Sequence, residues 1–170
     1  MPPVSWPDRV AIGGGGAALA AVVVARPVPG PAAILALLVA VVTVPLVLAD
    51  VRERRLPNAL TGALLVGAVA EALGSFAAGR PPSGVVATVG TALALGVLHV
   101  AGGLGLGDVK LGAALACPLG LVDPLGAAFA PACAFVLAGC WAVPLLVRRD
   151  RGRVAFGPFQ LAAFWIVLLL

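Results

Sequence analysis

Residues 31–50 read PAAILALLVAVVTVPLVLAD, an uncharged and mostly apolar run of 19 residues that ends in the carboxylate of Asp50. A helix needs about 20 apolar residues to cross a bilayer, so this run is long enough to span a membrane. The whole chain has the same character, because 62% of its 170 residues are hydrophobic and only 11% are charged. A water-soluble domain has roughly half apolar and about a quarter charged residues, so this composition excludes one. We therefore predict an integral membrane protein.

Six further apolar segments lie on either side of this run. They predict an all-α fold, a polytopic integral membrane helix bundle of six or seven transmembrane helices that forms one domain over residues 1–170. The first segment contains four consecutive glycines and the segment 109–122 is short, so either could be a partial helix. The first segment also fits a cleaved signal peptide, because Arg9 precedes an apolar stretch with small residues. The six segments cover approximately residues 10–25, 59–79, 83–101, 109–122, 124–147 and 154–170.

The basic residues lie in the short gaps between the apolar segments. If the gap at 50–58 faces the cytoplasm, nine lysines and arginines lie on the cytoplasmic side and two lie outside. This asymmetry follows the positive-inside rule and places the N-terminus inside. Because the chain is also rich in Ala, Gly, Pro and Arg, we predict a multi-pass protein of the bacterial cytoplasmic (inner) membrane, in contact with lipid. The inner set is Arg9, Arg52, Arg54, Arg55, Lys110, Arg148, Arg149, Arg151 and Arg153, and the outer set is Arg26 and Arg80.

The composition argues against nucleic-acid binding and against a metal site. The chain has no Tyr, only six Phe and three Trp, and no basic patch interleaved with aromatic residues, so we predict no nucleic-acid partner. Cys117, Cys133 and Cys140 lie in apolar runs without a C-x-x-C spacing, and His99 is the single histidine. This pattern supports neither a disulfide framework nor a metal site, and we expect His99 to hydrogen-bond within the bundle.

Three of the seven acidic residues need an explanation, because carboxylates in or near a bilayer are costly and usually functional. Asp50 and Asp108 lie at the ends of apolar segments, and Glu71 lies about twelve residues inside the third segment, near 18 Å along a helix. We expect Glu71 to be a buried, hydrogen-bonded and protonated acid. The other four are expected to be solvated charges in the polar gaps, namely Asp8, Glu53, Asp123 and Asp150.

Asp50 and Asp108 fall on the same face of the membrane, at the ends of the second and fourth apolar segments. Each alone has a plain interpretation as a helix-end charge. Held close together, two carboxylates cannot both ionise freely, so one keeps a proton. The ionised partner can then activate water and the protonated partner can donate to a peptide carbonyl, as in an aspartic protease. The glycines at 102, 103, 105 and 107 leave room for such a close approach.

Three motifs resemble the prepilin peptidases, the type IV leader peptidase family of GxGD-type membrane aspartic proteases. Residues 50–58 are similar to the family's Asp, five residues, Leu-Pro-Asp/Asn. Residues 105–111 are similar to G-x-G-D-x-K-L, and residues 156–159 to F-G-P-F. The family's longer members carry paired C-x-x-C motifs in an N-terminal region, which has no counterpart here, so the chain resembles the short, peptidase-only form.

The resemblance implies an aspartic-type endopeptidase that removes the leader of type IV pilin-like precursors, including Flp/Tad-type ones, at the cytoplasmic membrane face. Its catalytic residues would be Asp50 and Asp108, with no metal or organic cofactor. Its partners would be the precursor, membrane lipid and other pilus or secretion assembly components. Gly105, Gly107 and Lys110 belong to the second motif, and Lys110 has a second interpretation as a boundary lysine. Turn chemistry already explains the remaining supporting residues, Pro57 and Asn58.

Two other functions remain open from the residues alone. A small proton- or cation-coupled transporter would use Asp50, Glu71 and Asp108 along one path through the membrane. A non-catalytic membrane scaffold would make both aspartates dispensable. The peptidase explains better why Asp50 and Asp108 lie on the same face, each inside its own motif. Presenilin-type proteases share the Gly-x-Gly-Asp element but pair it with Tyr-Asp and Pro-Ala-Leu, which this chain lacks.

Overall fold

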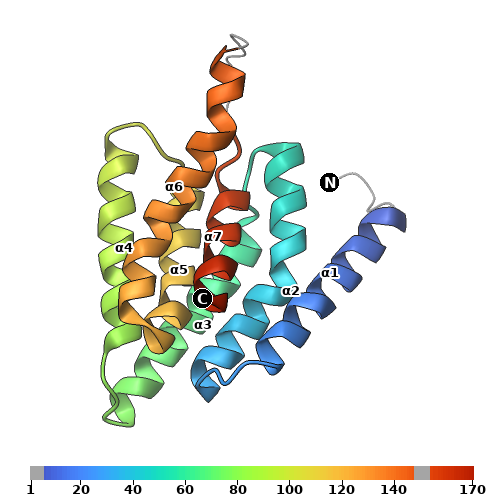
Figure 1. Ribbon diagram of the computed structural model, residues 1–170. Coiled ribbons are helices and arrows are strands. Elements are labelled where there is room, and N and C mark those ends of the chain that lie inside the picture. The colour runs from blue at the N-terminus through green and yellow to red at the C-terminus, as the bar shows by residue number, and fades with distance from the viewer. Residues whose placement is uncertain (1–5, 148–153) are drawn as a thin grey trace.

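The computed structural model describes residues 6–147 and 154–170. Within these residues the chain forms seven α-helices and no strand, which confirms the all-α membrane bundle (Figure 1). Each of the seven predicted segments corresponds to one helix. The helices are α1 (Trp6–Val24), α2 (Gly30–Glu53), α3 (Asn58–Ala77), α4 (Ser83–Val100), α5 (Leu106–Val122), α6 (Pro124–Val147) and α7 (Gly157–Leu169).

Five of the described helices, α1 to α4 and α6, are long and apolar enough to cross a membrane. The apolar α7 is shorter, with 13 residues. Its Trp165 Nε1 donates a hydrogen bond of 3.2 Å to Thr43 Oγ1 of α2, so α7 is fixed against the interior of the bundle. The chain is therefore a polytopic helical membrane protein.

The central helix of the bundle is α5. It contacts α2, α3, α4, α6 and α7, and Figure 1 shows it behind α6 and between α4 and α7. Its residues are buried without interruption from Leu111 to Gly120. At Gly120 a Cβ would lie only 2.8 Å from the Ser83 carbonyl oxygen of α4, so the missing side chain lets the two backbones approach closely. This packing fixes α5, whose first turn carries Asp108.

The helix α1 is continuous through its four glycines. Gly15 and Gly16 face α2, where a Cβ at Gly16 would lie 3.5 Å from the Ala40 carbonyl oxygen. The Arg52 guanidinium of α2 donates two hydrogen bonds, of 2.6 and 2.9 Å, to the Asp8 carboxylate. Asp8 is only 7% exposed, so our expectation of a solvated boundary charge was wrong. Its burial is stabilised by the paired charge of Arg52.

The opposite end of the bundle, where α3 turns into α4, contains Glu71. The Arg80 guanidinium lies 3.0 Å from Glu71 Oε1, and the Ser75 hydroxyl donates a hydrogen bond of 2.6 Å to the same oxygen. The expected hydrogen bonding is confirmed, but the expectation of a protonated acid is replaced by an ion pair. The charge count places Arg80 on the outer side of the membrane, and its guanidinium reaches back to Glu71 on α3.

Two more of the acids that were expected to be solvated, Asp123 and Glu53, are exposed in the structure. Asp123 is exposed, as expected, and its carboxylate also accepts hydrogen bonds from the backbone N–H groups of Leu125 and Gly126, at 3.0 and 2.9 Å. It therefore caps the N-terminus of α6. Glu53 is exposed at the last residue of α2. Asp150 and the basic run Arg148 to Arg153 lie outside the described residues.

Candidate active site

Asp50 lies in the last turn of α2, which continues past the apolar run to Glu53. It is 6% exposed, and its Oδ2 accepts a hydrogen bond of 2.9 Å from the backbone N–H of Gly157, the first residue of α7. Free N–H groups at a helix N-terminus are suited to hold an anion. A Cβ at Gly157 would lie 2.7 Å from this same oxygen, so only glycine lets the backbone approach the carboxylate so closely.

Asp108 lies in the first turn of α5, which begins at Leu106 and not at the predicted residue 109. The backbone N–H of Gly105 binds the Asp108 carboxylate, and the Asp108 N–H donates to the Gly105 carbonyl at 3.1 Å. The carboxylate of Asp108, three residues after the N-cap, thus binds the N-cap N–H as the acid of a capping box does, whereas glycine has no side chain to complete the box. A Cβ at Gly105 would lie 3.0 Å from Asp108 Oδ2, so glycine again makes room for a carboxylate.

The two aspartates line one open pocket of about 680 Å³ at the upper end of the bundle in Figure 1. They come from helices that are far apart in the sequence, and the negative charge of Asp50 acts on Asp108. Arg54 and the glycine-rich loop before α5 also line the pocket. Its other walls come from α6 and from the segment before α7, namely Phe135, Ala138, Gly139, Ala142, Val154, Ala155 and Phe156.

Asp108 lies outside the apolar run 109–122, at the pocket end of α5. Burial, and second the charge of Asp50, raise the pKa of Asp108 from 3.8 to about 6, against the lowering effect of the Gly105 N–H. A carboxyl group with this pKa holds its proton more readily than an ordinary aspartate. Asp50 has a backbone N–H directed at its carboxylate. Because the charge of Asp50 raises the pKa of Asp108, one carboxyl group of the pair can hold a proton while the other is ionised, as a general acid and a general base require.

The loop before Asp108 is shaped by one positive-φ glycine and one histidine. Gly102 has φ of +80°, a conformation that glycine adopts without strain, and it ends α4. His99 Nδ1 lies 2.8 Å from the Leu104 carbonyl oxygen and donates to it when that nitrogen carries the proton. The expected hydrogen bond of His99 within the bundle is thereby confirmed. Together these contacts fold the loop back so that Gly105 can cap α5.

The other predicted supporting residues lie around the pocket in different ways. Gly107 faces Leu56, where a Cβ would be 3.4 Å from the leucine Cβ, so it lets the loop after α2 pack on α5. Lys110 is half-buried, two residues after Asp108. Pro57 is the N-cap of α3 and Asn58 is its first residue, so the predicted turn and helix start are confirmed.

Several residues were not assigned to this site from the sequence, although Phe156 and Gly157 belong to the third motif. Gly157 donates to Asp50, and Gln160 Nε2 donates a hydrogen bond of 3.1 Å to the main-chain oxygen of Asp108. Phe135 and Phe156 form an aromatic contact at 4.7 Å between ring centroids, and both line the pocket. The sequence contained a signal for two of them, Gly157 and Gln160. A Gly-Pro pair at a helix start exposes N–H groups, and a single amide in an apolar segment needs a polar partner.

These observations define a class, a polytopic helical membrane protein with two aspartates in one pocket at one end of its bundle. Residues 33–147 match the model of the type IV leader peptidase family, which is more than half of the chain. The chain therefore belongs to the type IV leader peptidase family, a family of peptidases, and the resemblance is confirmed. The match includes Asp50 and Asp108 and ends before α7. No curated protein and no solved structure matches the chain.

No cluster of three or more His, Cys, Asp or Glu side chains that could hold a metal ion occurs among the described residues. Within the same residues the three cysteines are free thiols, and Cys117 is buried with its Sγ 3.8 Å from the Ala68 carbonyl oxygen of α3.

The three acids singled out from the sequence do not share one pocket. Asp50 and Asp108 line one pocket, whereas Glu71 lines a different one beside the α3–α4 turn.

Proposed function

We propose that this protein is an aspartic-type endopeptidase that cleaves the leader peptide of type IV pilin-like precursors, including Flp/Tad-type ones. The observation that carries the proposal is the pairing of Asp50 and Asp108 in one open pocket, each held by the backbone N–H of a glycine. Membership of a leader peptidase family supplies the substrate class, because a leader is the segment that such a peptidase removes.

The two aspartates divide the proton transfers between them. Asp50, with the Gly157 N–H on its carboxylate, takes a proton from water as the water oxygen attacks the scissile carbonyl carbon. Asp108, whose pKa is raised to about 6, donates its proton to the carbonyl oxygen. When the C–N bond breaks, the leaving amine takes the proton held by Asp50, and the hydroxyl proton of the intermediate returns to Asp108.

The charges around the bundle support a cytoplasmic active site in a bacterial inner membrane. Arg52, Arg54 and Arg55 follow Asp50, and Lys110 follows Asp108, so the pocket end of the bundle is basic. The opposite end has Arg26 and Arg80. By the positive-inside rule the pocket end faces the cytoplasm, where the leader of a precursor lies before export.

The separation of the acids argues against the transporter that the sequence left open. A proton or cation path needs groups within reach of one another through the membrane. Glu71 lies at the far end of the bundle and its carboxylate is paired with Arg80 at 3.0 Å. It is therefore not part of a continuous path from Asp50 and Asp108.

The proposal is tested by expressing the protein in membranes with a pilin-like precursor and identifying the new N-terminus of the product by mass spectrometry. Wild type should remove the leader at one peptide bond, and Asp50→Asn should not. The matched control is Asp123→Asn, an exposed acid at the other end whose capping of α6 an asparagine preserves. Unprocessed precursor with wild type, or equal processing with Asp50→Asn, would overturn the proposal.

A further inference from the structure

An apolar groove of about 860 Å³ lies between α4 and α6, both of which also pack on α5. Small and apolar residues line it, and the side chain of Val86 on α4 is 65% exposed there. The lining from α4 includes Val86, Gly90 and Thr91, and that from α6 includes Ala128, Pro131 and Phe135. Residues of this kind let another helix approach closely inside a membrane.

The groove continues into the candidate active site. Phe135 lines both the groove and the pocket that contains Asp50 and Asp108. Its ring lies 4.7 Å from that of Phe156, which precedes the Gly157 that binds Asp50. Along α6 the groove runs from Pro124 to Phe135, about 16 Å at 1.5 Å per residue, or roughly half of the hydrocarbon core of a bilayer.

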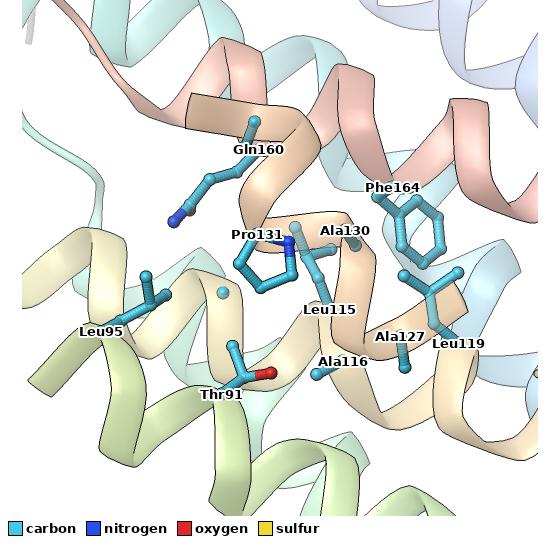
Figure 2. A pocket seen from close by; sticks show the side chains of 12 residues that line it. Thr91, Leu95, Leu115, Ala116, Leu119, Ala127, Ala130, Pro131, Gln160 and Phe164 are labelled. Atoms are coloured by element: carbon cyan, nitrogen blue, oxygen red, sulfur yellow. The ribbon is translucent and has the colours of Figure 1, made fainter. Parts of the chain in front are cut away.

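A buried polar atom without a partner lies beside the groove. An adjoining cavity shares Thr91, Ala127 and Pro131 with it, and Figure 2 shows Gln160 reaching across that cavity towards Leu95. Gln160 is 6% exposed, and its Nε2 donates to the Asp108 main chain. Its Oε1 is the one buried side-chain nitrogen or oxygen without a hydrogen-bond partner in the described part of the chain. Buried carbonyl oxygens almost always have a donor, so Gln160 Oε1 can accept a further hydrogen bond in this cavity.

We propose that the groove between α4 and α6 binds the hydrophobic helix of the precursor, with the start of that helix at Phe135 and the scissile bond at the two aspartates. The inference rests on the proposed function and names the part of the substrate that the same site recognises. The first four N–H groups of a helix have no intrahelical partner. The start of the precursor helix therefore brings N–H donors to the end of the groove at Phe135, next to the pocket of the two aspartates.

The first test is photocrosslinking in membranes with the Asp50→Asn protein and an uncut precursor. A photoreactive residue replaces either Val86 in the groove or Val66 on α3, two valines that are 65% and 69% exposed. We expect Val86 to crosslink to the helix of the precursor and Val66 to give only background. Equal crosslinking from both positions, or crosslinks from Val86 only to lipid or to a second copy of this chain, would overturn the proposal.

The second test fills the groove. A Cβ at Gly90 meets nothing within 4 Å, so Gly90→Leu projects into the groove without a clash in the protein itself. Gly96→Leu is the matched control, because Gly96 is on the same helix, is equally open and does not line the groove. Precursor cleavage should fall on the order of tenfold or more in Gly90→Leu and stay near wild type in Gly96→Leu.

The outcomes of the second test separate the two proposals. If wild type cleaves the precursor and Gly90→Leu cleaves it equally well, the docking groove is overturned and the peptidase function stands. If Gly90→Leu and Gly96→Leu lose the same activity, the loss has no connection with the groove and the docking proposal is again overturned. If wild type leaves every pilin-like precursor uncut, the proposed function itself fails.

Discussion

Glu71 and the two aspartates of the pocket lie at opposite ends of the bundle and are held in opposite ways. At the end beside the α3–α4 turn, Glu71 is paired with Arg80 at 3.0 Å and accepts a hydrogen bond from Ser75. At the other end, Asp50 and Asp108 are held by backbone N–H groups of glycines and face an open pocket. A carboxylate neutralised by an arginine stabilises the fold, whereas carboxylates held only by N–H groups stay available for proton transfer.

Apart from the aspartates themselves, the contrast predicts its largest effect at Gly157. In Gly157→Ala, the new Cβ would lie 2.7 Å from Asp50 Oδ2, so the carboxylate must move away from the backbone N–H. Misplacing a catalytic group by about 1 Å can cost on the order of 10²-fold in rate, and we expect a loss of that size in precursor cleavage. Gly62→Ala is the control, because a Cβ there meets nothing within 4 Å. Equal activity of the two variants would show that Gly157 does not position Asp50 for cleavage.

The second prediction concerns the proton on Asp108. Its pKa of about 6 arises from burial and, second, from the charge of Asp50. Asp50→Asn removes that charge and leaves the burial, so the pKa of Asp108 should fall towards its ordinary value of 3.8 without reaching it. A carboxyl-carbon NMR titration of aspartate-labelled protein measures this, with Asp108→Asn used to assign the resonance. An unchanged pKa in Asp50→Asn would show that the two groups do not interact.

The same pKa gives the direction of two pH effects. Because Asp108 binds its proton more tightly in the folded chain than in the unfolded chain, its contribution to stability falls as the pH rises from about 4 to about 6. Asp108 also loses the proton that it would donate as the pH rises above about 6. We therefore expect kcat/KM for precursor cleavage to decline as the pH rises through about 6. A pH profile that is flat on its alkaline side would contradict the assignment of Asp108 as the acid.

The smallest effect on activity is expected at the other end of the bundle. Glu71→Gln keeps an oxygen for Ser75 and Arg80 but removes the charge of the pair, so the protein should lose about 1 kcal/mol of stability. Precursor cleavage should stay within about twofold of wild type, because this cluster lies away from the pocket. Thermal unfolding in detergent, measured beside the cleavage assay, separates the two effects. A large loss of cleavage at unchanged stability would give Glu71 a functional role.

Much of the fold was predictable because charged residues are costly inside a bilayer, so membrane helices can be recognised in the sequence as long apolar runs. Apolar runs such as residues 31–49 indicated the position of each helix, and Asp50 and Asp108 were recognised as carboxylates at the ends of such runs. The predicted positions of the helix ends were less accurate. Hydropathy placed the start of α5 at residue 109, whereas capping by Gly105 begins the helix at Leu106.

The partners of the acids were not predictable in the same way. Gly157 lies 107 residues after Asp50, and only the packing of α7 against α2 brings its N–H to the carboxylate. The pairs of Asp8 with Arg52 and of Glu71 with Arg80 depend on how side chains fold back from helix ends. A charge count treats Asp8, Arg52 and Arg80 as separate loop charges, so it does not show that each of them is paired with another side chain.

The most direct test of the account is cleavage of a pilin-like precursor in membranes that contain Asp50→Asn, Asp108→Asn or Glu71→Gln at matched levels. General acid–base groups contribute about 10²–10⁴-fold each, so both aspartate variants should leave the precursor uncut. Glu71→Gln should process it at close to the wild-type rate. Processing that persists in either aspartate variant, or that is lost in Glu71→Gln alone, would contradict the assignment of Asp50 and Asp108 as the catalytic pair.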